Sequence, residues 1–409
     1  MPYPSGIIVL TALPVGLPPD RSARAAMRLI HTSDWHLGRT LHGENLLRHA
    51  EAFVDWLLAE AERLQVDAVL VAGDVYDRAV PPVDAVRLLD RALLGFARAG
   101  IPMIITSGNH DSAVRLGFGS GLSEAAGIHL RTSLADASRP VLLSDAAGPV
   151  AIYGIPYLLP DAVMAELDCA RSHEAVLTAV SARIRADARS RGIDRTVVLA
   201  HAFVTGARAT ESERDIRVGG VADVPAGVFD GFSYVALGHL HGQQDVGPAV
   251  RYSGSPLAFS FGERNHAKSV TLAELGGTGQ VTVTKLATPV PRPLREVRGR
   301  LDDLLARAGR DLAELAGAWV KVVLTDPARP AAPMERLREK WPHTLVLDFD
   351  PDGGLPGAGA DLERLAATTD PAEICALFVE FTSGGSPDDA QRAVLRAAVE
   401  AAQHAEVAA

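Results

Sequence analysis

The chain has 409 residues, of which 47% are hydrophobic, so its length predicts two or more domains and its composition argues against intrinsic disorder. No apolar run reaches the roughly 18 to 20 residues that a membrane helix needs, and two cysteines cannot form a disulfide framework, which favours a reducing cytoplasm and no membrane partner. The formal net charge of −10 does not indicate a nucleic-acid binder, although acidic metal ligands become locally cationic once loaded.

Residues 1–26 differ from the rest of the chain. They are rich in proline, and no basic region precedes their short apolar run, so a secretory signal fits poorly. We expect this stretch to be a disordered arm or an extension that begins at an upstream start codon chosen in error. The alternative is an added ordered strand.

From residue 27 to about residue 287, short β-branched runs alternate with amphipathic segments. Apolar residues at steps of three and four predict helices over residues 46–63, 82–99 and 175–188. This alternation predicts a largely parallel sheet covered by helices. Long helices are missing between three later strands, near residues 251–253, 269–272 and 281–283. These later strands predict a second, more antiparallel sheet packed on the first.

A proline-rich segment at residues 289–293 blocks both helix and strand and predicts a linker. After it, alternating strands and helices over residues 294–352 predict a small α+β domain. Two helices are expected within residues 361–409. The first begins at Asp370 and Pro371, a capping residue and a first-turn proline. Its apolar stripe packs either on its own domain or on a partner; the stripe consists of Ile374, Leu377, Phe378 and Phe381.

Polar side chains follow five of the predicted strands. They carry carboxylate, imidazole and amide groups, and they are Asp34, His36, Asp74, Asn109, His201, His239 and His241. Ligands collect beyond the carboxyl ends of the strands in an open α/β sheet, so we expect these side chains to form one site.

The number and type of these groups indicate a pair of metal ions. Seven ligands of mixed oxygen and nitrogen exceed what one tetrahedral zinc takes, and two ions roughly 3.5 to 4 Å apart fit better. Asp74 can present two oxygens and so suits bridging both. Without a thiolate, the set indicates manganese, iron or zinc. The expected reaction is hydrolysis of a phosphoester by a hydroxide that two metals activate.

Five short motifs resemble those of the calcineurin-like metallophosphoesterase superfamily. They are Asp34-x-His36, Gly73-Asp74-x-x-Asp77-Arg78, Gly108-Asn109-His110-Asp111, His201 and Gly238-His239-x-His241. Longer strings resemble the SbcD family, the nuclease subunits of bacterial SbcCD exonucleases; these strings cover residues 31–38, 73–78, 107–115, 212–216 and 251–256. The resemblance is dense over residues 27–287 and looser beyond. Residues 1–26 fall outside it, which favours Met27 as the true start.

The resemblance implies a role for each site residue. One metal would take Asp34, His36, Asp74 and His241, and the other would take Asp74, Asn109, His201 and His239. His110 matches the catalytic histidine of the family, which protonates or stabilises the leaving oxygen. Asp77 would orient His110. Arg78 and Arg115 are the nearest cations for contact with a phosphate.

The resemblance also implies a fold and a function. The expected fold is α/β, with a two-sheet β-sandwich flanked by helices over residues 27–287, a capping domain over residues 294–352, and helices over residues 361–409 that bind the ATPase subunit SbcC. The expected protein uses two manganese ions as a double-strand exonuclease and single-strand endonuclease on DNA ends and hairpins, in DNA repair and recombination. It would be a nucleoid-associated, cytoplasmic homodimer within a heterotetramer. Two alternatives are a stand-alone phosphatase or cyclic-nucleotide phosphodiesterase, and a DNA-end-binding scaffold with vestigial chemistry.

Overall fold

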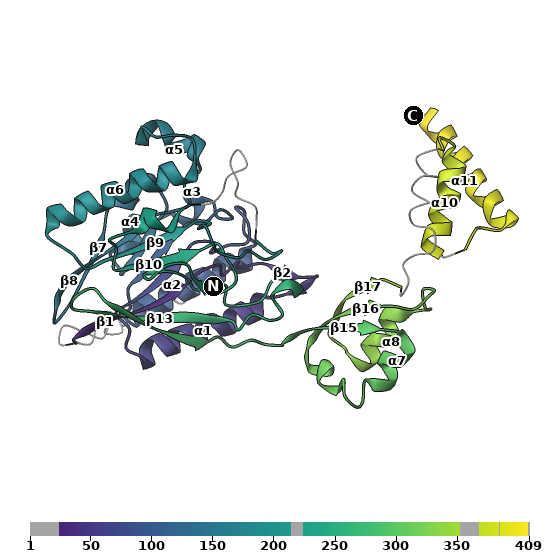
Figure 1. The fold of residues 1–409 in the computed structure, drawn as a ribbon, viewed down its shortest axis with the longest axis horizontal. Helices are drawn as coiled ribbons and strands as arrows, with labels where there is room; N and C mark the ends of the chain where they lie inside the picture. Colours follow the sequence, from purple (N-terminus) through teal and green to yellow (C-terminus); the bar gives the residue numbers. More distant parts are fainter. Residues whose placement is uncertain (1–23, 214–223, 352–367, 384, 408–409) are drawn as a thin grey trace, which may run out of the picture. The chain divides into compact units, whose positions relative to one another are not determined.

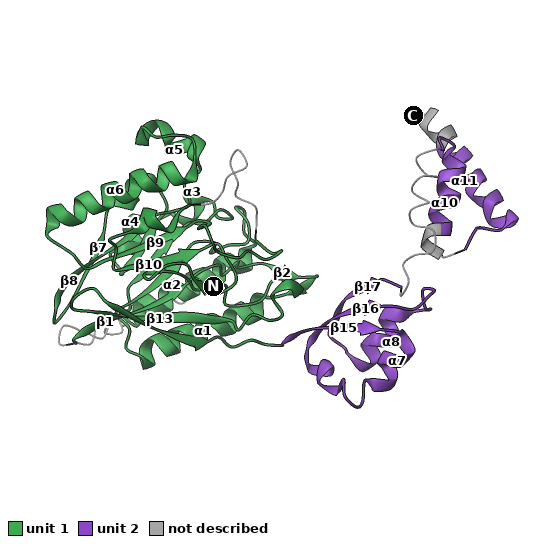
Figure 2. Cartoon of the chain, in the orientation of Figure 1, with its two compact units in different colours: residues 1–291 green, residues 292–409 purple. Residues whose placement is uncertain are grey.

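The computed structural model describes residues 24–213, 224–351, 368–383 and 385–407 (Figure 1). The chain divides into two compact units, residues 1–291 and residues 292–409 (Figure 2). The predicted N-terminal extension lies outside the described residues except for residues 24–26, and so does the start of the predicted C-terminal helical segment. None of the described helices is long and apolar enough to cross a membrane.

The first sheet of unit 1 has six strands in the order β14-β13-β1-β4-β5-β6. Strands β1, β4, β5 and β6 run parallel, and their bounds are Ala26–Thr32, Ala68–Ala72, Met103–Thr106 and Ile128–Arg131. Strands β13 and β14 add an antiparallel edge beside β1; they span Ser269–Gly276 and Val281–Ala287. Helix α1 (Leu47–Arg63) connects β1 to β4, and helix α2 (Val83–Arg98) connects β4 to β5 (Figure 1). Both helices present buried apolar stripes, as their sequence periodicity predicts.

The second sheet has the order β11-β12-β10-β9-β8-β7. Its parallel core consists of β8, β9, β10 and β12, which span Gly148–Gly154, Thr196–His201, Tyr234–Gly238 and Val250–Tyr252. Antiparallel strands lie at its edges: β7 over Val141–Asp145 and β11 over Gln244–Asp245. Helices α5 (Pro160–Leu167) and α6 (His173–Arg191) connect β8 to β9 and bury apolar residues in the same core as this sheet.

One expectation about the second sheet was wrong. Strands β13 and β14 do not form it, because they pair with β1 and extend the first sheet. The second sheet is instead mostly parallel, since β8 and β9 are joined by a helical crossover, which brings the chain back in the same direction. Alternation of strands and helices along the sequence does not say which strands share a sheet.

The two sheets pack face to face around a shared apolar core. Alternate residues of β1, β4 and β9 point into it, among them Leu29, Leu70 and Leu199, all fully buried. Side chains on such strands alternate between faces, so each sheet has a second buried face as well. In the second sheet, this other face packs on α6 through Val180 and Ile184. The sandwich fixes where the strand ends lie.

Unit 2 contains a parallel three-stranded sheet in the order β15-β16-β17, with bounds Leu294–Gly299, Trp319–Leu324 and Thr344–Phe349. Helices α7 (Leu301–Arg307) and α8 (Pro333–Lys340) contribute Leu304 and Leu337 to its core, together with the fully buried Trp341. Two further helices follow, α10 over Pro371–Ser383 and α11 over Asp389–Val407. Asp370 Oδ1 accepts a hydrogen bond from the N–H of Ala372 at 3.0 Å, where α10 begins.

Candidate metal centre

Strand ends from both sheets meet at one place in unit 1. Asp34 and His36 follow β1, Asp74 follows β4, and Asn109 follows β5 in the first sheet. In the second sheet, His201 ends β9, while His239 and His241 follow β10. The ligand atoms of Asp34, His36 and His241 lie within 4.8 Å of one another, and so do those of Asp34, Asp74 and His201. The structure therefore brings all seven sequence-predicted groups together.

The loops that carry these groups are fixed by hydrogen bonds to one another. Asp34, His36, Asp74 and His239 all have positive φ angles, of 53°, 43°, 50° and 104°. Such conformations are costly for residues other than glycine and persist only where surrounding contacts impose them. The contacts here are hydrogen bonds from Asp34 N to Gly73 O and from His36 N to Asp74 O, both 3.0 Å, and from His239 N to the Asp34 carboxylate at 3.1 Å.

Two glycines allow the loops to approach this closely. A Cβ atom on Gly108 would lie 2.1 Å from Asp74 Oδ1, and one on Gly238 would lie 1.8 Å from the carbonyl oxygen of Ala72. Real side chains do not tolerate such distances, so these positions require glycine for close packing. Gly238 thereby sets how closely β10 of the second sheet lies to β4 of the first.

The imidazoles of His36 and His241 face each other through their Nε2 atoms, 3.2 Å apart. His241 Nδ1 lies 2.7 Å from Ser212 Oγ, which in turn donates to Glu263 Oε1 at 2.6 Å. This chain of hydrogen bonds keeps the N–H of neutral His241 on Nδ1. His36 Nδ1 lies 3.5 Å from both Asp77 Oδ1 and Arg39 Nη1. The lone pair of His241 Nε2 therefore points at His36 Nε2, and a cation bound at this point would be held by both nitrogens.

A second cluster of possible ligand atoms lies next to the first. His201 Nδ1 donates to the carbonyl oxygen of Ala72 at 3.0 Å, so its Nε2, 2.8 Å from Asn109 Oδ1, is the nitrogen that becomes free to bind a cation once it loses its proton. His239 Nδ1 also lies 3.2 Å from that oxygen. Asp74 Oδ2 is 3.5 Å from His201 Nε2 and 3.6 Å from His36 Nε2, so it lies between the two clusters. Carboxylate, imidazole and amide donors of this kind fit divalent transition metals.

Burial and mutual charge control protonation in the cluster. Burial raises the pKa of Asp34 to about 6 and lowers the pKa of both His36 and His239 to about 3. Burial also opposes the charge of His201, but the carboxylate of Asp74 outweighs it and raises the pKa of His201 to about 9. The metal-free cluster therefore keeps a proton on His201, and a cation bound there would displace it.

His110 lies at the mouth of this cluster. Its Nδ1 donates to the backbone carbonyl oxygen of Asp77 at 2.8 Å, and its Nε2 lies 3.9 Å from Asp74 Oδ2. The carboxylate of Asp77 lies beside two other residues. Its Oδ1 is 3.5 Å from His36 Nδ1 and 3.5 Å from Arg39 Nη1. Asp77 therefore contacts His110 through its main-chain carbonyl group, and its carboxylate lies beside His36.

The predicted arginines differ in their positions. Arg78 lines an open pocket of about 450 Å³ together with His110, Asp77 and Arg39. Arg115 does not line this pocket; its guanidinium is exposed and donates to the carbonyl oxygen of Ala79 at 3.1 Å. Sequence reasoning missed Arg39, which stacks over the ring of Phe259 at 4.8 Å. Its place three residues after His36 was the available signal.

Three further residues that support the site were not predicted with any role. Ser212 and Glu263 fix the tautomer of His241, as described above, and Lys268 pairs with Glu263 while donating to the His241 carbonyl oxygen at 3.0 Å. Nothing in the short segment around Glu263 signals this contact, because it joins residues 22 positions apart. Asp111, quoted only as part of a motif, accepts hydrogen bonds from the N–H groups of Val75, Tyr76 and Gly108 and ties two strand-end loops together.

Comparison with known proteins decides the family. Residues 27–243 match the calcineurin-like phosphoesterase family, and residues 290–382 match a family described as the type 5 capsule protein repressor C-terminal domain. The SbcD subunit of the SbcCD nuclease from Escherichia coli K12 is 31% identical over 312 residues, covering 73% of this chain and 78% of that protein. Its counterpart in Staphylococcus saprophyticus is 30% identical over 348 residues, covering 83% and 90%. The chain belongs to the SbcD family of calcineurin-like phosphoesterases.

Membership in the SbcD family confirms the predicted family, fold class and enzyme class. The chain is a hydrolase of phosphodiester bonds and a nuclease of the SbcCD type, and its phosphoesterase domain implies divalent metal ions. Among solved structures, TT1561 of Thermus thermophilus is 12% identical with a TM-score of 0.38, covering 64% of this chain and 99% of that one. That likeness adds nothing to the assignment, which rests on the sequence relatives.

Gly238→Ala is expected to destabilise unit 1. The added methyl group would overlap the carbonyl oxygen of Ala72, and relieving that overlap should cost about 3 kcal/mol or more of unfolding free energy. The control is Gly227→Ala, whose Cβ would meet nothing closer than 3.5 Å and should change stability by no more than about 0.5 kcal/mol. Urea denaturation of both variants measures the difference. Equal stabilities would mean that the two sheets do not depend on glycine at this contact.

Proposed function

We propose that this chain is a manganese-dependent DNA nuclease that degrades double strands from their ends and cleaves single strands, together with the ATPase SbcC, in DNA end processing. The observation that carries the proposal is the pair of clusters of possible ligand atoms that share Asp74. One cation is assigned to Asp34, His36, Asp74 and His241, and the other to Asp74, Asn109, His201 and His239. The cytoplasm, at the nucleoid, is where such substrates lie.

The proposed ions and the residues that bind them have different roles. Two bound cations would activate a water molecule and neutralise charge on the phosphate. Asp74 suits the shared position because its Oδ2 lies between the clusters, while its Oδ1 accepts a hydrogen bond from the N–H of His110 at 2.9 Å. Manganese is proposed because the donors are oxygen and nitrogen with no thiolate.

His110 is proposed as the residue that protonates or stabilises the leaving oxygen. Its Nδ1 is committed to the carbonyl oxygen of Asp77, so its Nε2 is the atom that can hold a proton facing the substrate. A sugar alkoxide is a poor leaving group and needs such a donor. Asp77 retains a supporting role through its carbonyl group and through its carboxylate beside His36.

Phosphate contact is assigned to the cations at the mouth of the site. Arg78 and Arg39 line the pocket that also contains His110, so their guanidinium groups can meet a bound phosphate. Arg115 is kept as a weaker candidate, since its guanidinium reaches the main chain at Ala79, next to Arg78.

Two apolar surfaces support the proposed partners. Helix α10 exposes Phe378, 64% accessible, and Ile374, while Leu377 is buried; we assign the exposed face to SbcC. The side chain of Phe381, the fourth member of the predicted stripe, lies outside the described part of the chain. A second copy of this chain is proposed to cover exposed large apolar side chains of unit 1, which lie on α2 and in the segment over residues 113–124; they are Val83, Val86, Val114, Phe118 and Leu122.

A comparison of substrates tests the proposed function. Linear duplex DNA and a small aryl phosphodiester are assayed with manganese, with and without SbcC. A nuclease of the proposed kind cleaves the duplex much faster when SbcC and ATP are present, and the aryl ester at the same rate in both cases. A stand-alone phosphatase or cyclic-nucleotide phosphodiesterase would turn over only the small substrate, and a scaffold would turn over neither; either result contradicts the proposal.

Asp74→Ala and Asn109→Ala are expected to differ in metal content. Asp74 is assigned to both ions and carries charge, whereas Asn109 is neutral and is assigned to one. Elemental analysis of manganese-loaded protein should show a loss of about two ions for the first variant and about one for the second. Asp161→Ala, which removes an exposed carboxylate from α5, should lose none. Equal metal content in Asp74→Ala and Asn109→Ala would contradict the shared position of Asp74.

His110→Gln is expected to keep both ions but to cleave DNA about 10² to 10⁴-fold more slowly, because the leaving oxygen loses its proton donor. An aryl phosphodiester, whose phenolate leaves without help, should slow by less than about tenfold. Steady-state rates on both substrates and elemental analysis check the two parts. If both substrates slow equally, or if metal is lost, then His110 positions substrate or binds metal and is not the proton donor.

A further inference from the structure

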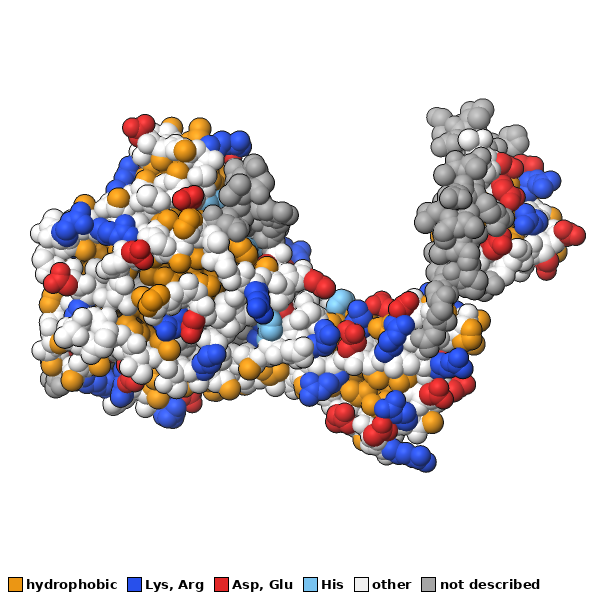
Figure 3. Space-filling model, in the orientation of Figure 1, with side chains coloured by type: hydrophobic (Ala, Val, Ile, Leu, Met, Phe, Trp, Pro, Cys, Tyr) orange, Lys and Arg blue, Asp and Glu red, His pale blue; other side chains and the backbone are white. Residues whose placement is uncertain are grey.

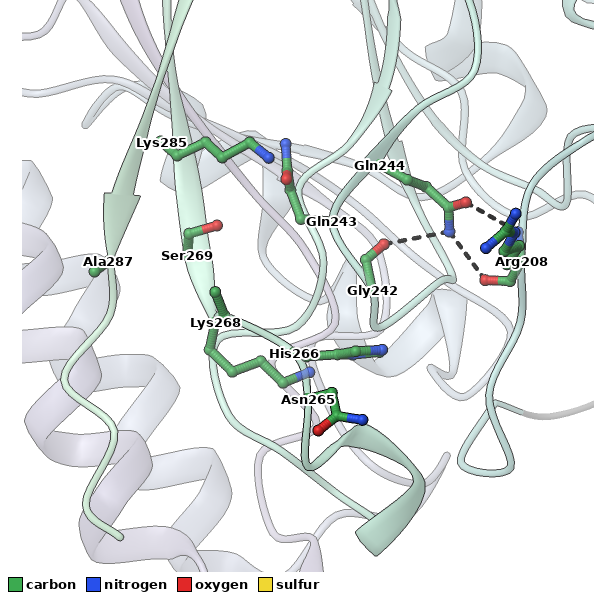
Figure 4. Close-up of a pocket in the computed structure, with 11 residues that line it drawn as sticks. Arg208, Gly242, Gln243, Gln244, Asn265, His266, Lys268, Ser269, Lys285 and Ala287 are labelled. Atoms are coloured by element: carbon green, nitrogen blue, oxygen red, sulfur yellow. Dashed lines mark hydrogen bonds between the residues drawn. The ribbon is translucent and has the colours of Figure 1, made fainter. Parts of the chain in front are cut away.

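A second pocket, of about 470 Å³, lies beside the proposed metal centre in unit 1 (Figure 4). Gly242, which lines it, follows His241 directly, and Lys268, which also lines it, donates to the His241 carbonyl oxygen at 3.0 Å. The remaining walls come from Arg208, from residues 243–244 and 265–267, and from the paired strands β13 and β14. The pocket therefore lies next to His241, a proposed metal ligand, and the main chain at His241 and Gly242 lies between them.

The pocket has a local positive charge. Arg208 and Lys285 line it, and neither side chain has an ion-pair partner among the described residues. Among the residues that the structure describes, no carboxylate lines the pocket, and the charge of Lys268 is balanced by Glu263, which does not line it. On the face that Figure 3 draws, acidic and basic side chains are by contrast interspersed on both units, and the whole chain carries a formal charge of −10. An anion is the ligand that such a pocket attracts.

Polar groups in the wall also lack partners. Ser269 on β13 is 5% accessible, and its Oγ has no hydrogen-bond partner in the part of the chain that the structure describes. His266 Nδ1 is buried and equally without one there. In Figure 4 the Ser269 hydroxyl points from β13 into the space below Lys285 and Gln243. Buried polar groups are normally satisfied, so a hydroxyl left open in a pocket lined by Lys285 and Arg208 indicates a ligand that accepts hydrogen bonds.

We propose that this pocket binds a backbone phosphate of the nucleic-acid strand whose scissile phosphate lies at the metal centre. Lys285 and the Ser269 hydroxyl contact the phosphate oxygens, and Arg208, on the opposite side of the pocket, adds positive charge that attracts the strand. Among the described lining residues the only aromatic ring is that of His266, so the pocket offers little for base stacking, and contact is with the backbone, independent of base sequence. This inference rests on the proposed nuclease function.

The test compares two double variants of the full chain. Arg208→Ala with Lys285→Ala removes both pocket cations, and Arg189→Ala with Lys340→Ala removes two exposed cations from α6 and α8 as a matched control. Binding of a short fluorescent phosphorothioate strand, which resists cleavage, is followed by anisotropy at several salt concentrations. The pocket variant should bind about tenfold more weakly, and the slope of log affinity against log salt should fall in magnitude by about 0.7 for each cation. The control should match the wild type.

Two further measurements sharpen the test. Ser269→Ala should weaken strand binding without changing the salt slope, because it removes a hydrogen bond and no charge. Turnover of the aryl phosphodiester should stay within about twofold of wild type in every pocket variant, since that substrate does not reach the pocket. Unchanged strand affinity and salt slope in the Arg208 and Lys285 double variant would overturn the inference.

Two other outcomes are distinguishable. If deoxyadenosine monophosphate binds the wild type and not the pocket variant, while strand binding is unaffected, the pocket serves a free nucleotide and the strand assignment is wrong. If the wild-type chain itself neither binds the strand nor cleaves DNA, the proposed nuclease function has failed and the inference fails with it. A wild type that binds and cleaves normally, beside an unaffected pocket variant, overturns the pocket assignment alone.

Discussion

The arrangement of this site depends on one buried carboxylate. Asp74 is almost inaccessible to solvent, and burial by itself would raise its pKa, yet the imidazoles of His201, His36 and His110 hold the pKa of Asp74 well below its usual value. A buried anion of this kind is costly unless cations surround it. The groups that surround Asp74 come from strand ends of both sheets. The site therefore exists only where the two sheets of the sandwich pack together.

The loops at these strand ends are strained because of the same requirement. Asp34, His36, Asp74 and His239 take positive φ angles, and each is fixed by main-chain hydrogen bonds to a neighbouring loop. Asp111 and Glu263 then support these loops from behind, one through three backbone N–H groups and the other through Ser212. Asp111 holds two loops together, whereas Glu263, through Ser212, decides which nitrogen of His241 faces the proposed metals.

The two pockets beside the site contain cations that a polymeric anionic substrate would need. One pocket contains His110 with Arg39 and Arg78, and the other, which adjoins His241 through Gly242, contains Arg208 and Lys285. Because the chain carries a formal net charge of −10, local cations are needed to position a polyanion on it. Under the proposed function, the strand would be held by its phosphates at both pockets while the bond between them is cleaved.

The sequence by itself determined the family and predicted which residues meet at the candidate metal centre, because these residues lie within a few positions of strand ends, in short local motifs. It also predicted the elements of the small domain in unit 2, whose strands and helices alternate with clear periodicity. Tertiary structure alone decided that β13 and β14 join the first sheet, that the Asp77 carbonyl and not its carboxylate holds His110, and that Glu263 supports His241. Each of these depends on contacts between residues far apart in the chain or on the direction in which a side chain turns, and neither is encoded in local spacing.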